Sequence, residues 1–282
     1  MTLFLNFRSQ AVGGAVIQPY VLEGNGAVPT PPALRAIGDS EFAARAAGKN
    51  VLFAVHGFNV SYEDGARSLG QLEAQLDLTA TDIYLGVLWP GDYWLPVVNY
   101  PFEGGVAMDC GRRLADFCGR LLARAQSISL ISHSLGARVV LEAVKNLGRR
   151  ARVVCLTAAA INQDCLQTEY AAAAANADSI SILASHEDWV LKIAFQAGDP
   201  IADALRDDHA FFEKALGYDG PPLPAPPPIQ SPWQIPDVAD YGHGDYLPPG
   251  DAVQVPPAPG ARWLNSAGFM ARAFRNQRQT WP

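Results

Sequence analysis

The sequence predicts an α/β fold: a mostly parallel central sheet that helices cover on both faces. Two observations lead to this prediction. Short apolar runs rich in β-branched residues alternate with helical patterns along most of the chain, and most of these runs are apolar on both faces of the strand they predict. Strands that are apolar on both faces belong in a parallel sheet covered on both sides. The intervening helices then supply the crossover connections.

Five apolar runs predict inner strands, and a sixth segment, residues 3–7, alternates like a half-exposed strand. Between the runs, Ser61 can cap a helix with Asp64 at its third position, followed by leucines at helical spacing. Three further helices are expected, at residues 111–125, 135–147 and around 171–175. The five inner strands are expected at residues 51–55, 83–89, 128–131, 153–157 and 180–183.

Residues 220–260 hold thirteen of the 22 prolines. Proline lacks an amide donor and does not fit a central strand, so we expect an extended surface excursion that also carries His243. Residues 261–282 predict a C-terminal helix, because they are too few for a second domain. We therefore expect residues 1–282 to form a single domain.

Composition excludes several classes of protein. The 282 residues are 49% apolar and 17% charged, a balance that predicts a folded globular chain. The net charge of −7 argues against a nucleic-acid partner. No run of eighteen apolar residues predicts a membrane span, and the N-terminus lacks the basic region of a secretory signal. Four cysteines without paired spacing predict reduced, buried thiols, and we expect a cytoplasmic protein.

The segment Ser132-His133-Ser134-Leu135-Gly136 carries the clearest chemical signal. It follows a predicted strand and opens a predicted helix. A sharp turn at this point lifts the hydroxyl of Ser134 above the sheet, provided that the residues two before and two after are small. Ser132 and Gly136 satisfy this condition, although glycine is the usual residue at the first position. Ser134 is therefore the candidate nucleophile.

A serine hydroxyl needs a neighbouring base. His243 is the best candidate of the five histidines, because Gly242 and Gly244 let its loop approach another backbone closely. The base in turn needs an orienting acid. Asp188, which follows the strand at 180–183, is favoured over Asp164, which follows the preceding strand; both give the chain order serine, acid, histidine.

Four segments in order resemble the α/β-hydrolase superfamily. They are Val-His-Gly-Phe-Asn (55–59), Leu-Trp-Pro-Gly (88–91), Ile-Ser-His-Ser-Leu-Gly (131–136) and Gly-His-Gly-Asp-Tyr (242–246). Within the superfamily they resemble the lipase- and esterase-like serine hydrolases with an HGFN loop. The resemblance spans residues 51–246.

The resemblance implies that Ser134 attacks a carbonyl carbon, that His243 moves the proton and that Asp188 holds the imidazole. It also implies an oxyanion hole made by the backbone amides of Phe58 and Leu135, with His56 bracing the loop that supplies Phe58.

Substrate preference is expected to come from loops. Aromatic residues after the strand at 83–89 could wall an apolar pocket or pack beneath the loop, and Trp189 with Phe195 forms a second cluster. About twenty residues separate the strands at 153–157 and 180–183, too few for a large helical cap. The candidate substrate-contacting residues are Tyr93, Trp94, Tyr100 and Trp189.

The resulting hypothesis is a serine hydrolase that cleaves small-molecule carboxylic esters of short or medium acyl chain. No pair of histidines has metal-ligand spacing, so neither a metal nor a cofactor is expected. Two alternatives stay open: a non-catalytic ligand-binding protein on the same fold, and a peptidase or amidase that uses the same triad.

Overall fold

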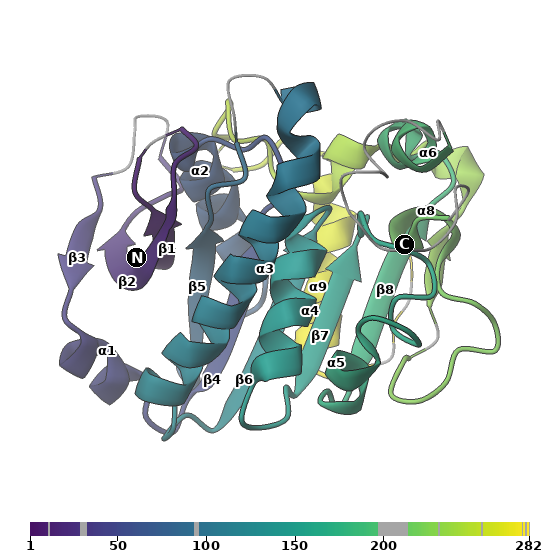
Figure 1. Cartoon of the computed structure of the whole chain (residues 1–282). Helices are drawn as coiled ribbons and strands as arrows, with labels where there is room; N and C mark the ends of the chain where they lie inside the picture. Colours follow the sequence, from purple (N-terminus) through teal and green to yellow (C-terminus); the bar gives the residue numbers. More distant parts are fainter. Residues whose placement is uncertain are drawn as a thin grey trace.

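The described residues form one nine-stranded sheet with helices on both faces (Figure 1). The computed structural model describes residues 1–10, 12–28, 33–92, 96–196, 214–230, 232–254, 256–277, 279 and 281, without the side chains of 96–104, 194–196 and 233. The strand order is β3-β2-β1-β5-β4-β6-β7-β8-β9. Pairing is antiparallel at β1–β2 and β2–β3 and parallel in the rest of the sheet. The predicted fold class is therefore confirmed.

The five predicted inner strands are all present and pair in parallel. β2 and the three-residue β3 form an antiparallel extension at one side, which the sequence analysis did not identify. The strands are β1 (Thr2–Arg8), β2 (Val16–Gly24), β3 (Arg35–Ile37), β4 (Asn50–Val55), β5 (Asp82–Leu88), β6 (Ser127–His133), β7 (Val153–Thr157), β8 (Ile180–Ser185) and β9 (Trp233–Ile235).

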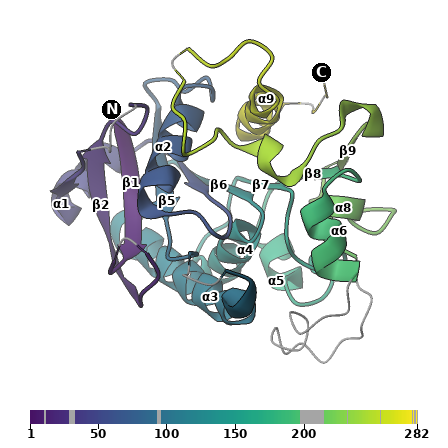
Figure 2. The same cartoon turned by 90° about the horizontal axis from the view of Figure 1, so that it is seen from above.

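Seen from above, α3, α4 and α5 cover one face of the sheet, and α2 and α9 cover the other (Figure 2). Ser61 caps α2 as predicted, because its Oγ accepts the Asp64 N–H at 3.1 Å. Between β7 and β8 the only helix is α5, so the chain inserts no large cap there. The helices are α1 (Asp39–Ala46), α2 (Tyr62–Glu73), α3 (Pro96–Leu121), α4 (Gly136–Asn146), α5 (Ala171–Ala175), α6 (Trp189–Gln196), α8 (Leu216–Asp219) and α9 (Trp263–Phe274).

The continuous apolar runs are explained by two separate cores. In β4, Val51, Phe53 and Val55 pack toward the α3–α4 face, whereas Leu52 and Ala54 pack toward the α2–α9 face. Successive side chains of a strand point to opposite faces, so a strand covered on both sides is apolar at most of its positions. Because these central strands run parallel, their carboxyl ends all lie at the same edge of the sheet.

Two local predictions were wrong. Residues 3–7 do not form a half-exposed strand: β1 lies between β2 and β5, and its polar Asn6 and Arg8 are buried. Both have hydrogen-bond partners, Tyr20 for Asn6 and Asp92 for Arg8. The helix expected at 111–125 begins at Pro96, so residues 96–102 are helical rather than a loop. Proline is favoured at the first helical position, where no amide donor is needed.

The proline-rich segment contributes to the sheet as well as to the surface. Within it, β9 pairs with β8 at the edge of the sheet, between Pro232 and Pro236. An edge strand tolerates flanking prolines because only one side of it must donate hydrogen bonds. Two 3-10 turns follow, η1 (Asp237–Ala239) and η2 (His243–Tyr246), and η2 carries His243.

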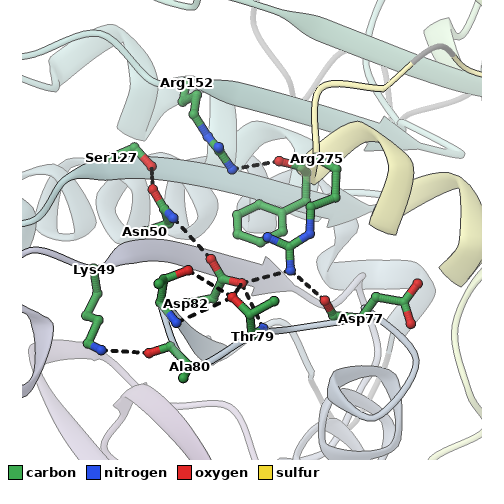
Figure 3. A network of polar contacts seen from close by, with 11 residues as sticks. Lys49, Asn50, Asp77, Thr79, Ala80, Asp82, Ser127, Arg152 and Arg275 are labelled. Carbon is green, nitrogen blue, oxygen red and sulfur yellow. Dashed lines mark hydrogen bonds and ion pairs between the residues drawn. The ribbon is translucent and has the colours of Figure 1, made fainter.

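A polar network at the amino edge of the sheet fixes the end of α9 (Figure 3). The buried Asp82 carboxylate accepts hydrogen bonds from Arg275 Nη2 at 2.8 Å and Asn50 Nδ2 at 3.1 Å. On the same side, Arg152 Nη2 donates to the Phe274 carbonyl at 2.6 Å. The C-terminal helix is therefore tied to β4, β5 and the start of β7 by charged groups as well as by its apolar face.

All four cysteines are buried and free, as predicted. Burial raises the pKa of the Cys118, Cys155 and Cys165 thiols far above its ordinary value. In the part of the chain that the structure describes, no helix has both the length and the hydropathy needed to cross a membrane.

Candidate active site

Ser134 occupies a strained turn between β6 and α4. Its φ is +53°, a left-handed conformation that a residue with a Cβ adopts only when its surroundings enforce it. The Ser134 N–H donates to the Thr157 carbonyl at 3.1 Å, and the Ser134 carbonyl accepts from Ala160 N–H at 3.2 Å. Residues at and after the end of β7 thus hold the turn, and it presents the hydroxyl at the carboxyl edge of the sheet.

Close backbone contact explains the small residues around Ser134. A Cβ at Gly136 would lie 2.6 Å from the carbonyl oxygen of His56, closer than atoms can approach. A Cβ at Gly57 would lie 3.0 Å from Cβ of Ser134 and 3.0 Å from Nδ1 of His133. The loop after β4 therefore packs directly against the serine turn.

His243 bridges Ser134 and Asp188. Its Nε2 lies 2.8 Å from Oγ of Ser134, and its Nδ1 lies 2.7 Å from Oδ2 of Asp188. The tautomer that satisfies both contacts donates Nδ1–H to the carboxylate and accepts the serine O–H at Nε2. The structure therefore joins three residues that lie as much as 109 positions apart in the sequence.

Asp188 is fully buried at the junction between β8 and α6. Its second oxygen, Oδ1, accepts the Leu191 N–H at 3.0 Å and caps the first turn of α6. The carboxylate is thereby fixed on both sides, by a helix start and by the imidazole. Asp164, the alternative acid, lies in the turn after β7, and it is Asp188 that accepts the hydrogen bond from His243 Nδ1.

His133 has a role that the sequence analysis missed. Its Nε2 lies 2.9 Å from the His243 carbonyl oxygen, and the centroids of the two rings are 4.8 Å apart. Burial, together with the nearby His243, lowers the pKa of His133 to about 3, so the ring is neutral at pH 7. Side chains alternate along a strand, so the sequence does predict that His133 and Ser132 point to opposite faces. It gives no sign of the hydrogen-bond partner of His133, which lies 110 residues away.

The candidate oxyanion donors lie on either side of the serine. Leu135 is the N-cap residue of α4, so its N–H belongs to the positive end of that helix. Phe58 lies between Gly57, which faces Ser134, and Asn59, whose N–H donates to the Gly91 carbonyl at 2.6 Å. Asn59 also has a left-handed φ of +56°, so the loop turns sharply just after Phe58.

His56 is completely buried behind this loop. Its Nδ1 lies 2.8 Å from the Gly57 carbonyl oxygen, and its ring stacks on Trp89 with centroids 5.8 Å apart. Burial and the charge of Arg8 lower its pKa to about 3, so the neutral ring donates Nδ1–H to Gly57. His56 thus hydrogen-bonds within the loop that contains Phe58 and packs that loop against Trp89.

Of the candidate substrate-contacting residues, Trp189 is the first residue of α6 and is 60% exposed, with Lys192 Nζ 4.5 Å from its ring centroid. Tyr93 and Trp94 lie outside the described residues. Tyr100 lies within α3, but its side chain and that of Phe195 are outside the described part. Among the side chains that are described, no group of three or more His, Cys, Asp or Glu is placed to hold a metal ion.

A mostly parallel, helix-covered sheet with a serine in a strand-to-helix turn defines an α/β hydrolase. Residues 39–201, more than half of the chain, match the family described as "Alpha/beta hydrolase of unknown function (DUF900)", and the chain belongs to that family. No curated protein matches the sequence. The resemblance to the superfamily is thus confirmed, and the hydrolase fold carries the site described above.

Proposed function

We propose that the protein is a serine hydrolase that cleaves carboxylic esters, with Ser134, His243 and Asp188 as its catalytic triad. One observation carries the proposal: the two hydrogen bonds, of 2.8 and 2.7 Å, that run from Ser134 through His243 to the buried Asp188. Nucleophile, base and orienting acid stand in the order that acyl transfer requires.

In the proposed reaction, Ser134 Oγ attacks the ester carbonyl carbon while its proton moves to His243 Nε2. Asp188 accepts the Nδ1–H and stabilises the imidazolium. The tetrahedral oxyanion accepts hydrogen bonds from the backbone N–H groups of Leu135 and Phe58, each worth roughly 10²–10³ in rate. Collapse breaks the ester C–O bond, and His243 returns the proton to the leaving alcohol. Water then attacks the acyl-enzyme by the same route and releases the acid.

Short and medium acyl chains are the proposed substrates. Only the five-residue α5 intervenes between β7 and β8, so a large cap is absent where related folds can insert one. The exposed Trp189 follows Asp188 directly and is the proposed apolar contact, together with Tyr93, Trp94 and Tyr100.

Two further proposals concern the whole protein. We propose a cytoplasmic location, in keeping with its four free cysteines. We also propose a single domain, because strands from Thr2 to Ile235 share one sheet.

The test is hydrolysis of p-nitrophenyl esters from acetate to palmitate by the wild-type protein and by Ser134→Ala. We expect a Ser134-dependent rate with its optimum at short or medium chains. A parallel series of p-nitroanilides separates an esterase from an amidase. A wild-type rate equal to that of Ser134→Ala on every substrate would refute hydrolysis at this site and favour a ligand-binding protein.

A further inference from the structure

The loop that contains Phe58 is bonded along one side to the segment that follows β5. Trp89 Nε1 donates to the His56 carbonyl at 2.9 Å, and Asn59 N–H donates to the Gly91 carbonyl at 2.6 Å. The loop residues that form these two hydrogen bonds, His56 and Asn59, stand before and after Phe58 in the sequence. The two bonds give a structural role to the Leu-Trp-Pro-Gly segment, which has no part in the proposed chemistry.

Arg8 makes a third connection to the same loop. It is the last residue of β1, and its Nη2 donates to the Val60 carbonyl at 2.5 Å. Its Nη1 forms an ion pair with Asp92 Oδ1, which also accepts the Gly13 N–H at 3.3 Å. The side chains of Arg8 and Asp92 are only 1% and 7% exposed.

Stability alone does not account for a buried ion pair here. Removing two charges from water is costly, and apolar residues of similar volume are often as stable or more so. Apolar residues, however, cannot form the directional hydrogen bonds that a guanidinium forms. The planar guanidinium holds Asp92 with one nitrogen and the Val60 carbonyl with the other, so it fixes the distance between two loops.

We propose that Arg8, held by Asp92, is a positioning residue that fixes loop 56–60 and thereby aims the Phe58 N–H at the oxyanion. This inference rests on the proposed hydrolase function. Arg8 does not touch the substrate. It acts through the loop, at the carboxyl edge of the strand next to β5.

The main test variant is the double substitution Arg8→Met with Asp92→Asn. It removes both buried charges together, so it avoids an unpaired charge that would unfold the protein, and Asn can still accept from Gly13. Arg8→Lys is the conservative variant, because an ammonium keeps the charge but loses the planar fork. Arg45→Met is the matched control: it breaks an ion pair with Glu23, which pairs with the opposite end of β1.

In the double variant we expect kcat for the best ester to fall roughly 10- to 100-fold, part of the loss expected for a missing oxyanion donor, with KM changed less than about threefold. Inhibition by an alkyl trifluoromethyl ketone, whose serine adduct carries the same oxyanion, should weaken by a similar factor. Arg8→Lys should lie between the double variant and wild type, and Arg45→Met should match wild type. Wild-type kcat and inhibition in the double variant would overturn the inference.

Hydrogen exchange of the amides in residues 57–60 provides a readout that does not need turnover. We expect faster exchange there in the double variant and no change in Arg45→Met. Unchanged exchange would overturn the inference even in an active enzyme. The two hypotheses fail separately. If the wild type shows no Ser134-dependent hydrolysis, the proposed function is refuted; if exchange is nevertheless faster in the double variant, Arg8 still holds the loop.

Discussion

His133 Nε2 lies 2.9 Å from the carbonyl oxygen of His243, so the neighbour of the candidate nucleophile holds the backbone of the candidate base. The ring of His133 lies between the loop at Gly57 and the turn η2. Because its pKa is lowered to about 3, His133 stays neutral and can donate this hydrogen bond across the ordinary working range of pH. The turn at Ser134 and the turn η2, which carries His243, are thereby connected through the side chain of His133.

Replacing His133 should therefore slow turnover without removing any group that takes part in the chemistry. We expect His133→Leu to lower kcat about five- to tenfold, the order of magnitude of one net hydrogen bond. His133→Gln, which can still donate to the His243 carbonyl, should recover part of this loss. Steady-state kinetics on one ester checks both variants. Equal losses in Leu and Gln would mean that ring volume, and not the hydrogen bond, is what matters.

Loss of either end of the Ser134–His243 hydrogen bond should abolish hydrolysis. Ser134→Ala and His243→Ala should each reduce kcat on the order of 10⁴–10⁶-fold, since the members of a triad act as a unit. His186→Ala is the control, because His186 is partly exposed and its ring nitrogens lie 3.9 and 3.5 Å from the carboxylates of Asp219 and Asp237 instead. Initial rates suffice as the measurement, and a tenth of wild-type activity in either alanine variant would contradict the assignment.

The acid should be identified by comparing two asparagine substitutions. Asp188→Asn is expected to cost on the order of 10⁴ in kcat, because the amide no longer enforces the Nδ1–H tautomer of His243. Its Oδ1 can still cap α6 through Leu191 N–H, so the melting temperature should change little. Asp164→Asn should leave kcat within about threefold. The opposite order of effects would move the acid to the turn after β7.

The parallel half of the fold could be predicted because it is encoded locally. Each inner strand is apolar at most positions, as in residues 51–55. Short apolar runs of this kind, when helical patterns separate them, are best explained as the strands of a parallel sheet. The turn at Ser134 is also local, since small residues on both sides and the flanking strand and helix are all visible in sequence. His243 could be proposed from chain order. The reason given from its flanking glycines was wrong, because a Cβ at Gly244 would meet no atom within 4 Å and one at Gly242 would meet only Oδ2 of Asp245, at 3.6 Å.

What the sequence did not reveal depends on partners far away in the chain. Nothing near Arg8 in the sequence indicates its partner Asp92, which lies 84 positions away. The partner of His133, the carbonyl of His243, is also far away in the chain. Polar residues are normally exposed, so a polar residue in a strand suggests solvent until its buried partner is known. Residues 96–102 were misassigned because proline and aromatic residues there suggest a loop, although Pro96 starts a helix.

Stability should depend on pH through Asp82, which ties α9 to the sheet. Burial opposes its charge, but hydrogen bonds from Arg275, Thr79 and Asn50 outweigh that effect and lower the pKa to about 2. The folded pKa is below the unfolded value of about 3.9, so the contribution is complete above pH 5 and is lost as pH falls from about 4 toward 2. A difference of roughly two pKa units corresponds to about 2–3 kcal/mol.

Asp82→Asn should therefore lower the free energy of unfolding by about 2–3 kcal/mol at pH 7, and the deficit relative to wild type should shrink as pH approaches 3. Urea unfolding at pH 7, 5, 4 and 3 measures this difference. Asp39→Asn is the control, because Asp39 and Arg120 form an ion pair whose side chains are about half exposed, and such pairs contribute little. A deficit that stays constant from pH 7 to pH 3 would show that Asp82 contributes through shape rather than through its charge.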